Sequence, residues 1–71
     1  MRTMFSIHCT MFNIPQIVVN ANTLNVKLLN RTDFLGRTCR FYATGDTNDL
    51  PTIMELLEET SDSVCCVGES E

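Results

Sequence analysis

Alternating apolar and polar residues predict strands at the start and in the middle of the chain. From Phe5 to Met11 every second residue is apolar, which favours a strand over residues 3–12. Residues 37–44 alternate in the same way, with Phe41 on the apolar side. Both segments are therefore expected to form strands whose apolar faces line the core.

Three shorter segments complete the predicted sheet. Residues 16–19 and 24–29 are rich in β-branched and aliphatic side chains, and the polar residues 20–23 between them suit a hairpin turn. Residues 30–33 are polar and are expected to form a loop. The apolar run at residues 64–67 predicts a last strand that is buried on both faces or inserted within the sheet.

The spacing of apolar residues changes from two to three and four in the last third of the chain. Leu50, Ile53 and Leu57 fall on one stripe of a helix. Asp49 is suited to cap that helix by accepting hydrogen bonds from its free N–H groups. The pattern predicts a helix that ends near Thr60.

The resulting order, β-β-β-β-α-β, predicts a small two-layer α+β domain. Its antiparallel sheet would have four to five strands, with one helix packed on one face. The 71 residues allow a single domain, which we assign to residues 1–67, followed by an acidic tail at 68–71. Too many residues are hydrophobic, 44%, for a disordered chain.

Neither a membrane nor an export signal is expected from this sequence. No run approaches the roughly 18–20 consecutive apolar residues of a membrane span. The N-terminus lacks the uninterrupted apolar core and small-residue cleavage site of a signal peptide. We therefore expect a cytoplasmic protein without a membrane partner.

Charge is divided along the chain more sharply than hydrophobicity. All five basic residues lie before position 41, and eight of the nine acidic residues lie after position 45. The net charge is −4. Such a division concerns partners and solubility rather than fold. The acidic residues that we expect to contact a partner are Asp46, Asp49, Glu55, Glu58, Glu59 and Asp62.

Asp46 and Asp49 suit the N-terminus of the predicted helix, but the later acids do not stabilise it. Glu58 and Glu59 lie toward its C-terminus, where the helix dipole disfavours negative charge, and no Lys or Arg follows to compensate them. We therefore expect a small non-enzymatic binding protein, an inhibitor or regulator that docks its acidic helix on the basic surface of a larger protein. A protein that handles nucleic acid is one such target. Many small regulators encoded by viruses and phages resemble this chain in size and charge, although no motif supports that analogy.

A nucleic-acid surface is the alternative use of the basic residues. Lys27, Arg31, Arg37 and Arg40 would supply cations, and Tyr42 would supply a stacking platform. Nucleic-acid binders are usually basic, whereas this chain has an isoelectric point near 4.7. We therefore expect an ordinary solvated sheet face and no direct nucleic-acid binding.

Four cysteines raise the question of thiol or metal chemistry. Cys65 and Cys66 are neighbours and are strained as a disulfide, whereas Cys9 and Cys39 would meet only if their strands were adjacent. Buried free thiols are the expected state. The paired short spacing of zinc sites is absent, so a metal site built from Cys9, Cys39 and one of the later cysteines stays a minor alternative. Catalysis by Cys39 with His8 has equally little support, and no cofactor is expected.

Self-association is the second function class that the sequence suggests. The apolar runs at residues 17–19 and 64–67 are long for so small a monomer, and edge strands pair readily across a two-fold axis. A homo-oligomeric structural module, such as a homodimer, is therefore the main alternative to a partner-binding protein.

Overall fold

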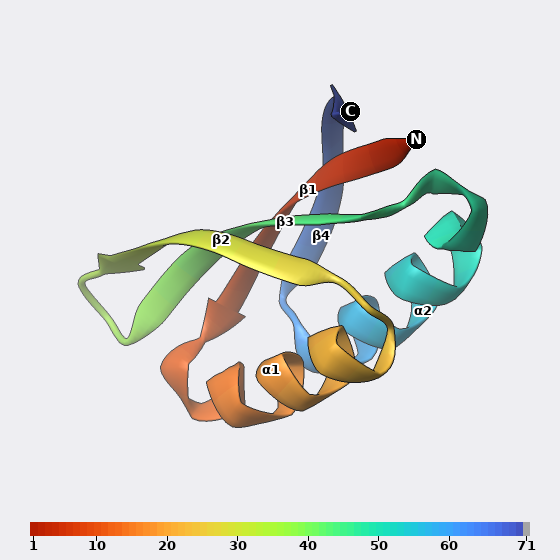
Figure 1. Cartoon of the computed structure of the whole chain (residues 1–71). Helices are drawn as coiled ribbons and strands as arrows, with labels where there is room; N and C mark the ends of the chain where they lie inside the picture. The colour runs from red at the N-terminus through yellow and green to blue at the C-terminus, as the bar shows by residue number, and fades with distance from the viewer. Residues whose placement is uncertain (71) are drawn as a thin grey trace.

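Both helices of the protein pack on the same face of a four-stranded antiparallel sheet (Figure 1). A computed structural model describes the backbone of residues 1–70 and the side chains of residues 1–68. A short 3-10 turn precedes each helix. The elements in chain order are β1 (Arg2–Thr10), α1 (Ile14–Thr23), β2 (Lys27–Phe34), β3 (Thr38–Asp46), α2 (Leu50–Thr60) and β4 (Ser63–Ser70).

The strands lie in the order β2-β3-β1-β4. β1 pairs antiparallel with both β3 and β4, and β2 pairs antiparallel with β3. Each helix therefore connects two parallel strands that have a third strand between them, which is the split β-α-β arrangement called ferredoxin-like. This confirms the predicted two-layer α+β class with an antiparallel sheet. The order is β-α-β-β-α-β with two helices, so the predicted order and single helix were wrong.

The main error concerns α1, which was expected to be one arm of a hairpin. The β-branched run at residues 17–19 favours a strand by propensity, but a helix begins at Ile14 with Pro15 in its first turn. Ile17 and Ala21 are buried against the sheet, whereas Val18 and Val19 are exposed. Burial of that helical stripe outweighs the small differences in propensity.

The strand that follows α1 begins and ends later than predicted. Residues 30–33 belong to β2 and do not form a loop. The pairing of β2 with β3 shifts by one residue between Leu29 and Arg31, and the extra residue Asn30 has a φ of 25°. This bulge keeps the polar segment in the sheet by adding one unpaired residue.

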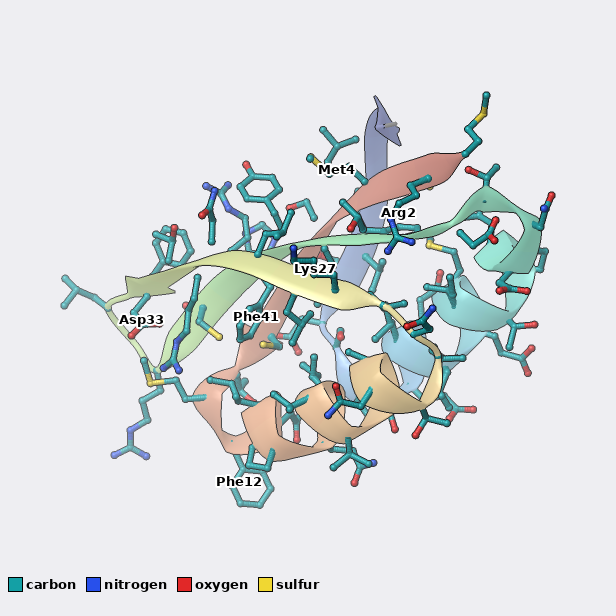
Figure 2. The ribbon with its side chains drawn as sticks, in the orientation of Figure 1. Arg2, Met4, Phe12, Lys27, Asp33 and Phe41 are labelled. Carbon is teal, nitrogen blue, oxygen red and sulfur yellow. The ribbon has the colours of Figure 1, made fainter. Side chains whose placement is uncertain are left out.

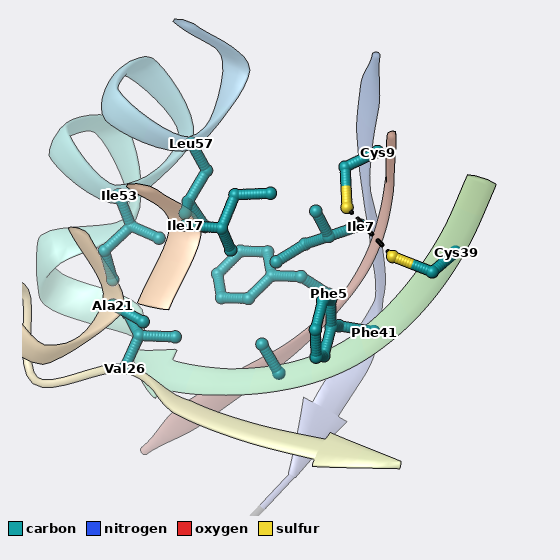
Figure 3. Close-up of a cluster of buried hydrophobic side chains, with 11 residues drawn as sticks. Phe5, Ile7, Cys9, Ile17, Ala21, Val26, Cys39, Phe41, Ile53 and Leu57 are labelled. Carbon is teal, nitrogen blue, oxygen red and sulfur yellow. Dashed lines mark hydrogen bonds between the residues drawn. The ribbon is translucent and has the colours of Figure 1, made fainter. Parts of the chain in front are cut away.

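The core lies between the sheet and the two helices (Figure 3). The odd-numbered residues of β1 face it, as the alternation predicted. Ile53 and Leu57 of α2 are fully buried there, which confirms the predicted helix and its apolar stripe. The buried apolar residues are Phe5, Ile7, Cys9, Ile17, Ala21, Val26, Cys39, Phe41, Ala43, Ile53 and Leu57.

The last strand is an edge strand, whereas burial on both faces was expected. β4 pairs with β1 alone, and Cys65, Cys66 and Val67 are exposed. Its backbone pairing with β1 continues to Ser70, within the segment expected to be an acidic tail. The final residue of that expected tail lies outside the described residues.

Candidate functional site

The six acids expected to bind a partner gather on α2 and at its two ends. Glu55, Glu58 and Glu59 lie on the helix and are exposed. At 100° per residue they fall within an arc of about 100°, opposite the buried Ile53 and Leu57. This group therefore points away from the sheet. We call it, together with the exposed flanking residues, the acidic surface: Asp46, Asp49, Glu55, Glu58, Glu59 and Asp62.

Two of the three flanking acids, Asp46 and Asp62, make hydrogen bonds with the backbone of another residue. The Asp46 carboxylate accepts a hydrogen bond of 3.0 Å from the Asn48 N–H and so caps the 3-10 turn before α2. Asp49 occupies the N-cap position of α2 but accepts no capping hydrogen bond, contrary to the sequence expectation. After the helix, the backbone N–H of Asp62 donates to the carbonyl of His8 at 2.8 Å. Both ends of the acidic surface are thus tied to the sheet or its turns.

None of these six carboxylates has a cationic partner within the described part of the chain. The single ion pair found there joins Arg31 to Asp33, at 2.7 Å between Nε and Oδ1. That bond raises the pKa of the Arg31 guanidinium. No cation is thus paired with the acidic surface within the described residues, and the electrostatic field of its three glutamates is directed outward from α2.

Cys9 and Cys39 meet in the core as directly opposed residues of β1 and β3 (Figure 3). Their sulfur atoms are 3.3 Å apart and both side chains are fully buried. Burial, aided by the adjacent Cys39 thiol, raises the pKa of the Cys9 thiol from 9.0 to about 12. A thiol with so high a pKa is protonated at neutral pH and is a poor nucleophile.

The structure does not bring together the residues of the other two thiol sites considered from the sequence, which are Cys39 with His8 and a metal site that includes Cys65 or Cys66. His8 lies on the opposite face of β1 from Cys9, so the sheet separates it from Cys39. Cys65 and Cys66 are exposed on β4, away from the buried pair. Among the described side chains, no three His, Cys, Asp or Glu residues are placed to hold a metal ion.

The face of the sheet away from the helices, which we call the open face, collects part of the expected basic group. Register places Arg40 and Tyr42 of β3 on this face, and Lys27 of β2 on the same face opposite Thr44, two residues beyond Tyr42. Arg31 faces the helix side. Arg37 lies in the turn between β2 and β3. Figure 2 shows Met4 on the open side of the sheet and Phe41 on the helix side, as their alternation requires.

Phe34 and His8, which the sequence did not place with the basic residues, lie next to Arg40 and Tyr42 on the open face. The Arg40 guanidinium lies 5.8 Å from the ring centroid of Phe34 and 5.1 Å from that of Tyr42. The imidazole of His8 lies 6.2 Å from the Phe34 ring. We call this group the aromatic–arginine cluster; its members are Arg40, Tyr42, Phe34 and His8. Alternation in β1 already placed His8 on the polar side, but Phe34 follows a segment mistaken for a loop.

Comparison with models of known protein families gives no match, and comparison with curated protein sequences gives none either. Neither helix in residues 1–70 has the length and apolarity needed to cross a membrane. No pocket is found among the residues that the structure describes. The candidate sites of this molecule are its surfaces and the buried thiol pair.

Proposed function

We propose that this protein is a small binding module without enzymatic activity, an inhibitor or regulator that docks its acidic surface on a basic surface of a larger protein. The observation that supports the proposal is the group of six exposed carboxylates around α2, none paired with a cation among the described side chains. A protein that handles nucleic acid carries a surface of the required sign. Free thiols suit a reducing compartment, so we place this function in the cytoplasm.

The acidic surface is mildly unfavourable in the isolated protein. Glu55 repels Glu58 and Glu59 at spacings of three and four residues, at a cost of a few tenths of a kcal/mol per pair. Glu58 and Glu59 also lie in the last turns of α2, where the helix dipole opposes them and no basic residue is present. A basic partner removes both penalties, which favours association over the free state.

The size of the surface sets the kind of interface to expect. α2 has 11 residues and is therefore about 16 Å long. With its flanks it offers a low-end interface of roughly 600–800 Å² per partner. Charge complementarity acts mostly on association rate and specificity, so binding should weaken strongly as salt is added.

The test removes or reverses the charge of the three glutamates on α2 while the helix itself is kept. Partners are captured from the native cell at moderate salt with the wild type, and the affinity of the purified partner is then measured for two triple variants. Glu55, Glu58 and Glu59 changed to Gln should bind at least tenfold more weakly, and the same residues changed to Lys should not bind. Asp33→Asn is the matched control, because Asp33 is an acid outside the acidic surface.

Two results would remove the proposal. Binding that both triple variants retain would show that the acidic surface is irrelevant. Equal loss in Asp33→Asn would show that net charge matters and the surface does not. Circular dichroism of each variant confirms that α2 is still folded.

A second copy of the chain is the alternative partner, and β4 is the observation that favours it. β4 is an edge strand with a free row of backbone donors and acceptors, and residues 63–68 carry no charge. The other edge, β2, also has a register shift but carries Lys27, Arg31 and Asp33, whereas the register shift of β4 falls at the uncharged Val67. Antiparallel pairing of two β4 strands would join two sheets into one of eight strands.

Light scattering at increasing concentration tests this alternative. The wild type should approach the mass of two chains, and Val67→Lys, which puts a charge on β4, should remain at one. Val19→Lys is the matched control, because Val19 on α1 is exposed to the same extent, 56% against 55% for Val67. A wild type that stays at one chain, or a dimer that Val67→Lys leaves intact, would exclude pairing through β4.

A further inference from the structure

The open face carries cations next to aromatic rings, and the proposed function of the acidic surface does not account for them. Arg40 stands between the rings of Phe34 and Tyr42, within the range of cation–π contact with both. Its Nε is buried and has no hydrogen-bond partner among the described residues. A buried donor without a protein partner is uncommon, and ordered water is one group that satisfies such a donor.

Negative charge is largely excluded from this face. Among the described strand side chains, Asp46 is the one acid that alternates onto it, and it stands opposite Arg2 at the end of the sheet. Asp46 is four residues from Tyr42 along β3, which is about 13 Å. That distance exceeds the Debye length of about 8 Å at physiological salt, so Asp46 does little to cancel the cations at the cluster.

The three glutamates of the acidic surface lie on the other side of the molecule. Glu55, Glu58 and Glu59 point away from the sheet, and the helix layer and the core separate them from the open face. The net charge of −4 therefore does not describe what a ligand meets at the open face. The three glutamates of α2 and the cations Lys27 and Arg40 are therefore on opposite faces of the molecule.

We propose that the open face binds single-stranded nucleic acid through the aromatic–arginine cluster. Bases stack on the exposed sides of Tyr42 and Phe34, and phosphates contact Arg40 and Lys27. Stacking platforms beside a cationic groove hold single strands with little sequence preference, because every base has a π-face. A duplex hides those faces, so it should compete poorly. This proposal departs from the expectation set by net charge and does not rest on the acidic surface.

The protein supplies its own reporter for the test. Tyr42 is the one tyrosine of the chain and there is no tryptophan, so intrinsic fluorescence reports on the cluster directly. Fluorescein-labelled 12-nucleotide oligo(U) and oligo(dT) are titrated by anisotropy at 50 mM NaCl, and tyrosine emission is followed with unlabelled strands. Saturable binding of either strand with quenching of Tyr42 is expected.

Variants separate stacking from charge. Tyr42→Leu should weaken binding about tenfold, since one stacked base contributes roughly 1–3 kcal/mol. Two phosphate contacts should give a slope of about −1.4 for log affinity against log salt, and Arg40→Gln should reduce its magnitude by about 0.7. Arg31→Gln is the matched control, because it removes the same charge on the helix side of the sheet.

Several results would overturn the proposal. These are the absence of saturable binding up to about 1 mM protein, unchanged affinity in Tyr42→Leu, and equal weakening by Arg31→Gln and Arg40→Gln. Polyphosphate or poly-glutamate that competes as well as oligo(U) would show a site for anions or acidic peptides and not for nucleic acid. Unchanged circular dichroism confirms that each variant is folded.

Discussion

Cys9 and Cys39 show how one pair of facing residues can look reactive and be inert. Their sulfur atoms are close enough to interact, at 3.3 Å, yet both thiols are fully enclosed by the core. Burial and the mutual proximity of the thiols keep the pKa of Cys9 high, so the proton stays on sulfur at neutral pH. Both residues therefore act as small apolar side chains that hold β1 against β3.

Gly45 is the residue at which the close approach of α2 to the sheet leaves no room. A Cβ atom built there would lie 2.8 Å from Cδ1 of Ile53 and 3.2 Å from Cγ2 of Val26. Both neighbours are buried, so a shift of either side chain disturbs the core around it. Gly45→Ala should therefore lower the free energy of unfolding by about 1–2 kcal/mol, measured by urea denaturation.

Gly68 provides the control for that substitution. A Cβ at this position on β4 meets no atom within 4 Å. Gly68→Ala should leave the free energy of unfolding unchanged or raise it by up to about 0.5 kcal/mol, because alanine restricts the unfolded chain. Equal effects of the two substitutions would show that packing at Gly45 is looser than the structure indicates.

At the scale of the element, the start of α2 should contribute to stability through Asp46 and not through Asp49. Asp46 accepts a hydrogen bond from the Asn48 N–H, whereas Asp49 at the N-cap position accepts none. Asp46→Ala should lower the free energy of unfolding by about 1 kcal/mol, and Asp49→Ala by no more than a few tenths. Urea denaturation of both variants checks this. A larger loss of stability in Asp49→Ala than in Asp46→Ala would show that Asp49 caps the helix after all.

Among the helices and strands, some could be predicted from the sequence and one could not. α2 was predictable because its apolar residues recur at helical spacing and its acids lie opposite them. β1 and β3 were predictable because one face of each is buried and their residues alternate. α1 was not, because Ile17, Val18 and Val19 have strand propensity and the helix is decided by packing of Ile17 and Ala21 on the sheet.

The candidate sites divide in a similar way. The three glutamates of the acidic surface follow from helical spacing and its three aspartates from their places just before and after the helix, so all six could be named from the sequence. The aromatic–arginine cluster could be named only in part, because Phe34 reaches Arg40 through the pairing of β2 with β3 and His8 reaches Phe34 across β3. Strand order and a bulge decide those contacts, and neither is encoded in local pattern.

At the scale of the whole molecule, the two layers carry opposite charge. The helix layer ends in the uncompensated acidic surface, and the sheet layer ends in an open face bearing Lys27 and Arg40. If both proposed functions hold, one small chain presents two binding surfaces of opposite sign whose fields do not cancel at physiological salt. A partner protein and a nucleic acid could then be held at once on opposite sides.

This division also predicts how stability responds to salt. Only one ion pair is present within the described residues, and the acids of α2 repel each other without relief. The wild type should therefore become more stable between 10 and 200 mM NaCl, measured in urea because guanidinium would itself screen charge. With Glu55, Glu58 and Glu59 changed to Gln, stability at low salt should rise by about 0.5–1 kcal/mol and most of the salt dependence should vanish. Asp33→Asn, which removes a paired acid, should do neither; if it matched the triple variant, repulsion would be spread over the whole chain and not concentrated on α2.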